Sequence, residues 1–482
     1  MSCNTEGGQL TGLISYDLMA RAWDVVVIGG GNAALVSAMA AREVGARVLV
    51  LERADLTFRG GNSRHTRNIR CVHGEATAYN TGAYTHDELW RDLCSVGTGP
   101  SNEELARLTV RESESVPAWM EAHGAIFQPP LAGTLHLGRT NTFFLGGGKA
   151  LMNHYYRTLA AIGVPVLYEA SVEEVRMDGN RCTGLVVTTP EGRATVEATS
   201  FIAAAGGFEA NLEWLARYWG EGTRNYHIRG PRFNDGTILA ELLRGGASTA
   251  GEERGFHSVA VDARSPKFDG GIATRLDSIP FGVVLNRDAQ RFYDEGEDIW
   301  PKRYAIWGRN IAMQPDQIAY CIWDSKVKHL SLPPMYGAYR GDTIEEVADA
   351  MGLEPGQAAA TVADFNRAVP GDAAALFDPS GLDGLSTTGI TPPKSNWAQR
   401  VDSPPYFGVP ARPGITFTYL GVGVDSTARV LHESDGRFAN VWAAGEIMSG
   451  NVLSSGYMAG FGMTIGTVWG RIAGTEAARH AI

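Results

Sequence analysis

The sequence is poor in cysteine, has no long apolar run and has no excess of positive charge. Its five cysteines are an odd number at wide spacing, and they form no CxxC pair and no iron–sulfur ligand run. This pattern favours a reducing, cytoplasmic setting, and no metal site is expected. Electrons that leave the protein would pass to a carrier on another chain. No stretch reaches about 18 uninterrupted apolar residues, so we expect no membrane span.

The charge balance is acidic, with 42 Lys and Arg against 53 Asp and Glu and a net charge of −11. This argues against a nucleic-acid partner, because phosphates require a basic face. An anionic small molecule would also be repelled by the overall field, so it would need a locally basic pocket. The 482 residues exceed one compact domain and predict two or three.

The texture of the sequence changes along the chain and divides it into four parts. Residues 1–22 are polar and lack the basic and apolar regions of a signal peptide, so they are interpreted as a leader. Residues 23–255 are rich in glycine and short apolar runs. Residues 256–414 are richer in proline, aromatics, Arg and Lys, which indicates an inserted domain. The glycine-rich texture returns in residues 415–482, as expected for the second part of an interrupted domain.

A βαβ unit opens the first part. Residues 24–28 form a short apolar run typical of a buried parallel strand, and residues 46–51 form a second one. Between them lies a GxGxxA pattern that opens a helix, and Glu52 follows the second strand. Such glycines permit a tight turn and close approach to a pyrophosphate, while the acid binds a ribose hydroxyl. The predicted contacts in this turn are Gly29, Gly31, Asn32, Ala33 and Ala34.

Further glycine turns indicate FAD rather than NAD. Backbone can approach the middle of a long cofactor at residues 59–63 and 205–207, and a helix that starts near residue 460 offers its N-terminus to a flavin ring. A nucleotide domain that begins near residue 24 and ends near residue 470 suits such a cofactor. The other FAD contacts that we predict are Arg53, Gly60, Gly61, Asn62, Ser63, Arg70, Val172, Ala205, Gly206, Gly207, Asp235, Gly445, Glu446, Ser455 and Gly456.

Two local predictions concern elements around this unit. Residues 86–124 have an amphipathic helical pattern, with Asn102 as an N-cap before two glutamates. Residues 183–199 resemble a hairpin that turns at residues 190–192.

The order of these motifs resembles the fumarate reductase/succinate dehydrogenase flavoprotein superfamily. More narrowly, the strings at residues 59–70, 291–298 with 300–304, and 444–448 with 460–466 resemble those of FAD-dependent tricarballylate dehydrogenases. The resemblance covers nearly the whole chain past residue 22. It implies an α/β fold, in which a Rossmann-like FAD-binding domain is interrupted by an α+β capping domain of the fumarate reductase flavoprotein type.

The resemblance also implies a reaction and a partner. A base removes the α-proton of a carboxylic acid while the β-hydrogen leaves as hydride to flavin N5, so that tricarballylate becomes cis-aconitate. Related enzymes run the reverse direction on fumarate. The implied electron acceptor is a separate, membrane-bound iron–sulfur/haem protein, which would place a cytoplasmic enzyme at the inner membrane through that partner. The FAD is expected to be non-covalent, although His65 lies in the region where succinate dehydrogenases attach it.

Site residues carry over from the family only in part. Arg303 corresponds to the proton-carrying arginine, and His257 and Thr274 to substrate-binding residues. Arg275 adjoins Thr274 and can pair with a carboxylate. Two carboxylate-binding positions of the dicarboxylate enzymes are lost, and Tyr457 resembles the tyrosine of flavin ketosteroid dehydrogenases. The other arginines that we expect to bind a tricarboxylate are Arg70, Arg139 and Arg232.

Several alternatives stay open at this point. Tyr457 favours dehydrogenation of a neutral, ketone-type substrate, while the basic cluster of residues 64–70 opposes it, because a neutral ligand gives buried arginines no partner. Reduction of an unsaturated acid, as by fumarate reductase, is a further alternative. So are a monooxygenase-like flavin enzyme acting on a cobalamin ring and a flavin-binding subunit without small-molecule turnover.

Overall fold

The computed structural model describes most of the chain. One predicted catalytic residue lies outside the described residues. Arg303 is that residue, so its role stays a prediction. The described residues are 17–96, 99, 101–130, 137–276, 279–297, 305–330 and 333–482.

A six-stranded, mostly parallel sheet is built from both ends of the chain. β1 (Trp23–Ile28) pairs in parallel with β2 (Val48–Leu51) on one side and with β10 (Ala198–Ala203) on the other. β10 pairs in parallel with β20 (Gly436–Ala443), which comes from the C-terminal part. These strands are almost entirely buried, as their continuous apolar runs require. The outer strands of the order β19-β20-β10-β1-β2-β6 are β6 (Val166–Leu167) and β19 (Arg429–His432).

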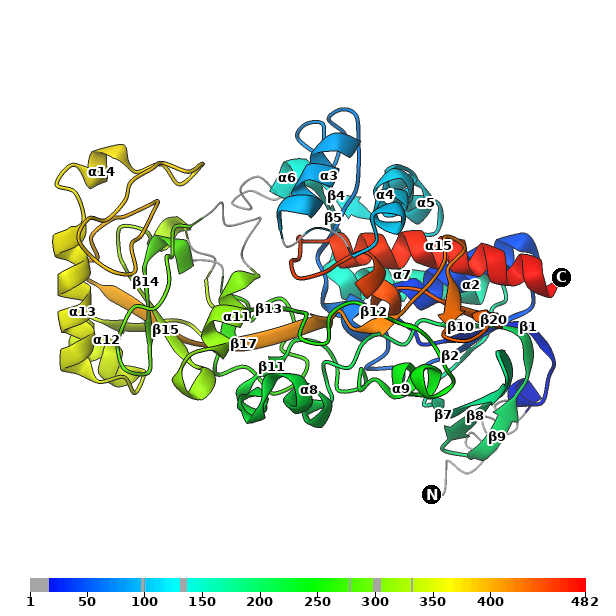
Figure 1. The fold of residues 1–482 in the computed structure, drawn as a ribbon. Helices are drawn as coiled ribbons and strands as arrows, with labels where there is room; N and C mark the ends of the chain where they lie inside the picture. The colour runs from blue at the N-terminus through cyan, green and yellow to red at the C-terminus, as the bar shows by residue number, and fades with distance from the viewer. Residues whose placement is uncertain are drawn as a thin grey trace, which may run out of the picture.

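Two helices pack closely beside this sheet. α2 (Asn32–Val44) follows β1, and α15 (Phe461–Ala481) lies along α2. In Figure 1, α15 is the red C-terminal helix. The contact depends on glycine: a Cβ on Gly470 would lie 2.8 Å from the Ala33 carbonyl oxygen, and one on Gly474 would lie 2.2 Å from that of Ser37. The C-terminal helix is therefore fixed against the start of α2.

A second six-stranded sheet is centred on one long strand. β17 (Tyr406–Thr418) pairs with β13 (Phe256–Asp262) and β15 (Ala319–Asp324) in antiparallel fashion. It extends from the end of the molecule that carries α12 (Ile344–Ala350) and α13 (Pro355–Ala368) toward the parallel sheet (Figure 1). The expected domain boundary at residues 414 and 415 falls inside β17, so the strand joins the two regions directly. The other strands are β11 (His227–Ile228), β14 (Val283–Asn286) and β16 (Tyr339–Gly341).

The remaining elements surround these two sheets. Small sheets are formed by β3 (Asn68–Arg70), β4 (Phe127–Gln128) and β5 (Asn141–Phe144), by β7 (Ser171–Asp178), β8 (Arg181–Thr189) and β9 (Gly192–Val196), and by β12 (Thr249–Ala250) and β18 (Gly421–Val422). The helices are α3 (His86–Ser95), α4 (Glu103–Glu112), α5 (Val116–Ala122), α6 (Leu137–Thr140), α7 (Gly147–Ala161), α8 (Leu212–Trp219), α9 (Thr237–Arg244), α11 (Ile306–Ala312), α12 (Ile344–Ala350), α13 (Pro355–Ala368) and α14 (Ala373–Leu376).

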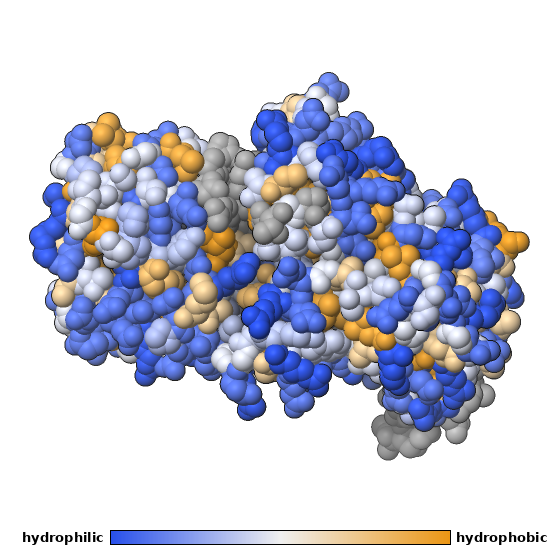
Figure 2. Space-filling view, viewed as in Figure 1, coloured by the Kyte–Doolittle hydropathy of each residue, from blue (hydrophilic) through white to orange (hydrophobic). Residues whose placement is uncertain are grey.

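The surface in Figure 2 is mostly hydrophilic, with apolar side chains in small scattered groups. Among the described residues, none of the helices combines the length and the hydropathy that a bilayer crossing requires.

Candidate active site

One long cavity runs from the start of α2 to the junction with β13 and β17. Its walls come from the β1–α2 turn, the end of β2, residues 61–68, residues 229–239, the end of β17 and the start of α15. The space between these walls, counted to the solvent at the mouth, is about 1550 Å³. The lining reaches from the β1–α2 turn to His257 and Tyr457, so a dinucleotide at one end leaves residues at the other end to contact a small substrate.

The turn after β1 forms a cradle that only glycine permits. Gly29 has φ +116°, and a Cβ on it would lie 2.3 Å from the Ala204 carbonyl oxygen. A Cβ on Gly30 would lie 1.9 Å from Glu52 Oε2, so the carboxylate sits directly against the turn. Gly31 is the N-cap of α2 and makes no side-chain cap, and it lines the cavity with the first residues of the helix. This cradle fits a pyrophosphate.

Glu52 lies where a ribose is expected. It is buried, and its Oε1 accepts a hydrogen bond of 2.8 Å from the Ala54 amide. Burial raises the pKa of this carboxyl above its ordinary value. Beside it, Arg53 donates to Asp235 at 2.6 Å, and both residues line the cavity. A buried carboxyl group and an ion pair thus gather at this end of the cavity.

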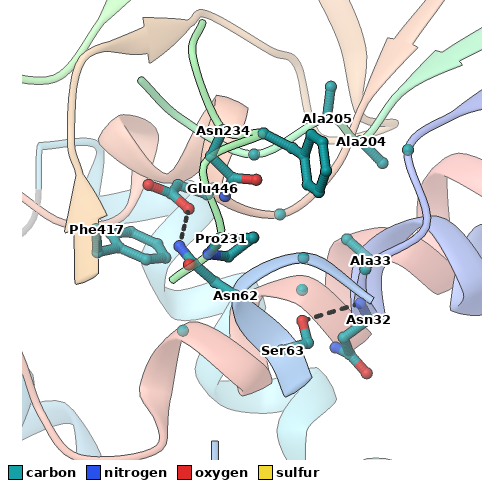
Figure 3. A pocket seen from close by; sticks show the side chains of 18 of the residues that line it. Asn32, Ala33, Asn62, Ser63, Ala204, Ala205, Pro231, Asn234, Phe417 and Glu446 are labelled. Carbon is teal, nitrogen blue, oxygen red and sulfur yellow. Dashed lines mark hydrogen bonds between the residues drawn. The ribbon is translucent and has the colours of Figure 1, made fainter. Parts of the chain in front are cut away.

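Asn62 and Ser63 connect the cradle to the middle of the cavity (Figure 3). The Asn32 amide donates to Ser63 Oγ at 3.0 Å. Asn62 Nδ2 donates to the Thr416 carbonyl at 2.7 Å and to Glu446 Oε2 at 3.3 Å. This loop therefore ties α2 to β17 and to the turn that follows β20.

The far end of the cavity is aromatic. His257, on β13, stacks on Tyr457 with ring centroids 3.8 Å apart and an interplanar angle of 9°. Phe417, on β17, lies 5.7 Å from the Tyr457 ring. The Tyr457 hydroxyl accepts a hydrogen bond of 3.1 Å from the Gly462 amide at the start of α15. The two predicted residues His257 and Tyr457 therefore lie side by side at this end of the cavity.

Arginine side chains make this end electropositive. Arg229 is buried and donates from Nη1 to Thr416 Oγ1 at 2.9 Å and from Nε to the Gly271 carbonyl at 3.3 Å. Burial, together with the positive charges of Arg229 and Arg275, lowers the pKa of His257 well below its ordinary value. The imidazole is therefore neutral at physiological pH. The arginines that line the cavity outside its ribose end are Arg67, Arg229 and Arg275.

His65 also lines the cavity and connects two of its walls. Its Nε2 lies 2.9 Å from Asp269 Oδ1, and a Cβ on Gly271 would lie 2.9 Å from its Nδ1. The ring is thus held against the segment that leads to Arg275.

Most predicted residues are brought together here, although their contact with FAD remains a proposal. The predicted residues that line the cavity are Gly29, Gly31, Asn32, Ala33, Glu52, Arg53, Gly61, Asn62, Ser63, Val172, Ala205, Gly206, Asp235, His257, Arg275, Gly445, Glu446 and Tyr457.

Three of the arginines expected to bind carboxylates, Arg70, Arg139 and Arg232, do not line the cavity. Arg70 is also one of the predicted FAD contacts, so both of its predicted roles lack support from the lining. Arg70 Nε donates to the Ala459 carbonyl at 3.0 Å and its Nη1 to Tyr84 at 2.9 Å, so its buried guanidinium is directed away from the cavity. Arg139 pairs with Glu88 outside the cavity. Arg232 is exposed and is not a lining residue.

Six other predicted positions lie behind the lining. Ala34 is buried inside α2. The Ser455 and Gly456 carbonyls accept from Arg309 and Tyr419, respectively. Thr274 donates to the Gly271 carbonyl at 3.3 Å. Gly60 packs on Met152, and Gly207 packs on Thr418 and Glu446, where a Cβ would lie within 2.3 Å of their oxygens.

The sequence interpretation missed Arg229, Asn234 and Glu209. Arg229 follows β11 in a segment without a recognised motif. The pairing of β11 with β17 brings this residue to the cavity. Glu209 and Asn234 lie beside the glycine turn after β10, and a polar pair next to that turn is a signal that could have indicated them.

Comparison with known proteins identifies the cofactor. Residues 24–463 match the model of the FAD binding domain family. The chain belongs to this family. It is an FAD-dependent oxidoreductase, and the cradle of glycines, Glu52 and the first turn of α2 fit the dinucleotide.

Relatives and solved structures agree on the fold of this flavoprotein. A probable fumarate reductase of Shewanella frigidimarina is 26% identical over 95% of this chain and 75% of its own length. The open conformation of a flavocytochrome c3 fumarate reductase has a TM-score of 0.74 at 22% identity, covering 100% of this chain and 82% of the other. The 3-ketosteroid Δ1-dehydrogenase of Sterolibacterium denitrificans has a TM-score of 0.72 at 19% identity, covering 95% and 99%. The fold is that of the fumarate reductase flavoproteins.

Proposed function

We propose that this flavoprotein desaturates a small polycarboxylic acid, and that the substrate is tricarballylate, which becomes cis-aconitate. The observation that carries the proposal is that Arg229 and Arg275 lie close enough to His257 to act on its charge, in a cavity that Arg67 also lines. In a protein of net charge −11, a cluster of cations in a cavity supplies the locally basic pocket that a polyanion needs.

The arginines bind and orient the acid in this proposal. Guanidinium groups form paired hydrogen bonds with carboxylates and so fix which carbon faces the flavin. Neutralising the carboxylate next to the reacting carbon also makes its α-proton easier to remove. Arg229 is held from two sides by Thr416 and Gly271, so it is oriented before substrate arrives.

The aromatic residues shape the reacting end. His257 is neutral and buried, so it supplies a hydrogen bond without adding charge. Its stack with Tyr457, flanked by Phe417, excludes water from one wall. Bound FAD supplies the hydride acceptor. Arg303 remains our candidate for the group that receives the α-proton, and it lies outside the described residues.

A substrate panel tests this proposal. FAD-loaded protein is assayed with an artificial electron acceptor against tricarballylate, succinate and a cyclic ketone, with chromatography of the product. We expect turnover with tricarballylate and formation of cis-aconitate. An active enzyme that oxidises the ketone and leaves tricarballylate unchanged would overturn the proposal.

A second candidate is dehydrogenation next to a ketone, and the placement of Tyr457 in the cavity favours it. A tyrosine hydroxyl that accepts from the Gly462 amide can donate its own proton to a carbonyl oxygen. The similarity of fold to a ketosteroid dehydrogenase is consistent with this role. The three cavity arginines favour the acid over this candidate, because guanidinium groups can pair with its carboxylates and a ketone offers them no charge.

The direction of the reaction and the electron acceptor are also proposals. We propose oxidation of the acid with delivery of electrons to a separate iron–sulfur/haem protein, the arrangement through which a cytoplasmic enzyme would associate with the inner membrane. Assays with a reduced dye and an unsaturated acid test the reverse, fumarate reductase-like direction. Reduction much faster than oxidation would reverse the proposed direction.

A further inference from the structure

Two buried carboxyl groups lie side by side next to the FAD cavity without a cation between them. Asn62 Nδ2 donates to Glu209 Oε1 as well as to Glu446 Oε2 at 3.3 Å, so one amide group bridges both acids. Glu209 is completely buried and Glu446 is 9% exposed. Among the described residues, neither glutamate has an ion pair with Lys, Arg or His.

The other contacts of these acids come from neutral groups. Asn234 Nδ2 donates to Glu209 Oε1 at 2.7 Å, and the Thr418 amide donates to Glu446 Oε1 at 2.9 Å. Two adjacent carboxylates in such surroundings cannot both be charged at low cost. Burial raises the pKa of Glu209 to about 7, and burial with the neighbouring Glu209 holds the pKa of Glu446 well above its ordinary range.

The position of the pair relates it to the cofactor. Glu446 lines the cavity, and Asn62 is followed by Ser63, which contacts the α2 amide at the pyrophosphate cradle. Figure 3 shows Glu446, Asn62 and Ser63 in a row that leads to Asn32. A full negative charge on the pair would therefore stand in the same cavity as the diphosphate.

We propose that Glu209 and Glu446 hold a shared proton beside the FAD site, and that this proton is required for tight FAD binding. Loss of the proton places a buried negative charge near the diphosphate and weakens binding. Glu209 and Glu446 act here as positioning residues, and the inference does not depend on which substrate is oxidised.

Other charged groups face this region and must be separated from the pair. They are His65 on the Asn62 loop, and Arg229 and Asp235 on the segment that carries Asn234, all of which line the cavity. Arg229 donates to the Thr416 hydroxyl, and Asn62 donates to the carbonyl of the same residue. His65 is the one histidine among these groups, so it needs a control variant of its own.

The test is a titration of FAD against the apoprotein from pH 6 to pH 9, followed by quenching of flavin fluorescence. We expect the Kd to rise with pH by up to about tenfold per unit, the limit for one linked proton. Glu209→Gln replaces one of the two carboxyl groups with a neutral amide, so no proton is shared between two acids, and it should remove most of the slope. Glu241→Gln changes a buried glutamate outside the cavity, on α9, and should keep it.

Further measurements keep the inference falsifiable if a variant does not fold. His65→Gln should retain the slope, whereas its loss in this variant would assign the proton to His65. In the wild-type protein, the infrared absorption of a protonated carboxyl group should disappear as the pH rises. The midpoint of this loss should equal the midpoint of the change in the Kd for FAD. A Kd that is constant from pH 6 to pH 9, or a slope that Glu209→Gln retains, overturns the inference.

Discussion

The positive charges of Arg229 and Arg275 favour the deprotonated form of His257, and they would favour the deprotonated form of a bound acid in the same way. Burial is the larger reason that the imidazole of His257 stays unprotonated, and the positive charges of the two arginines add to the effect. The same charge attracts a carboxylate, so at this end of the cavity a neutral histidine and an anionic ligand are favoured together. The proposed binding of a polycarboxylate therefore depends on individual guanidinium groups rather than on the net charge of the chain.

Replacing Arg275 tests this role. Arg275→Met removes a charged hydrogen-bond donor, and such bonds contribute roughly 1.5–3 kcal/mol. We expect the KM for tricarballylate to rise about 10- to 100-fold, with little change in FAD affinity, in steady-state assays. Arg232→Met, an exposed arginine that does not line the cavity, is the matched control and should stay near wild type. Equal effects of both substitutions would contradict the assignment.

Arg303 carries a second prediction at this scale. Arg303→Gln should lower kcat by about 10²- to 10⁴-fold, the range of general acid–base catalysis, while the flavin spectrum stays unchanged. Lys302→Met, next to it in the sequence, should keep near-normal turnover. If Lys302→Met shows the larger loss, the proton acceptor has been misassigned.

Glu209 predicts a pH dependence of stability. The pKa of its carboxyl is raised from 4.5 to about 7 in the fold, so between these values the unfolded chain releases a proton that the folded chain keeps. Stability should fall as the pH rises through this window and level off above it. Thermal unfolding of the cofactor-free protein should show a shallower fall for Glu209→Gln than for wild type. Parallel curves would show that the group has no raised pKa.

At the scale of elements, the contact between α2 and α15 depends on small residues. Gly474→Ala would place a Cβ 2.2 Å from the Ser37 carbonyl oxygen and push the helices apart. We expect a loss of about 1–3 kcal/mol in the free energy of unfolding, measured by urea titration. Gly371→Ala, which has no atom within 4 Å of its added Cβ, should change it by less than about 0.5 kcal/mol.

Local elements were predictable where chemistry acts over a few residues. The strand predicted at residues 24–28 is β1, the predicted N-cap Asn102 accepts from the Leu105 amide at 3.2 Å, and the hairpin turn at residues 190–192 joins β8 and β9. Apolar runs, caps and turn residues determine these features directly.

Side-chain directions in the basic cluster were not predictable. Arg67 and Arg70 stand three residues apart, yet Arg67 lines the cavity and Arg70 points into the packing of Tyr84 and Ala459. The direction is set by the pairing of β3 with β5, a contact between distant segments. Local spacing carries no information about that pairing.

At the scale of the whole molecule, the cavity depends on segments that are far apart in the sequence. Its pyrophosphate cradle comes from β1 and α2, and its aromatic end from β13, β17 and the start of α15. β20 must insert beside β10, and β17 must extend across the molecule, before these residues meet (Figure 1). Motif order indicated the family, whereas Arg229 could be located only from this tertiary arrangement.

The central claim is that the flavin lies next to a site for a polycarboxylic acid. The most direct measurement is anaerobic mixing of the FAD-loaded protein with tricarballylate, without any other acceptor, while the flavin absorbance is recorded. We predict bleaching of the oxidised flavin band and one equivalent of cis-aconitate per flavin. An FAD-loaded protein that is bleached by a ketone substrate and stays fully oxidised with tricarballylate would contradict this account.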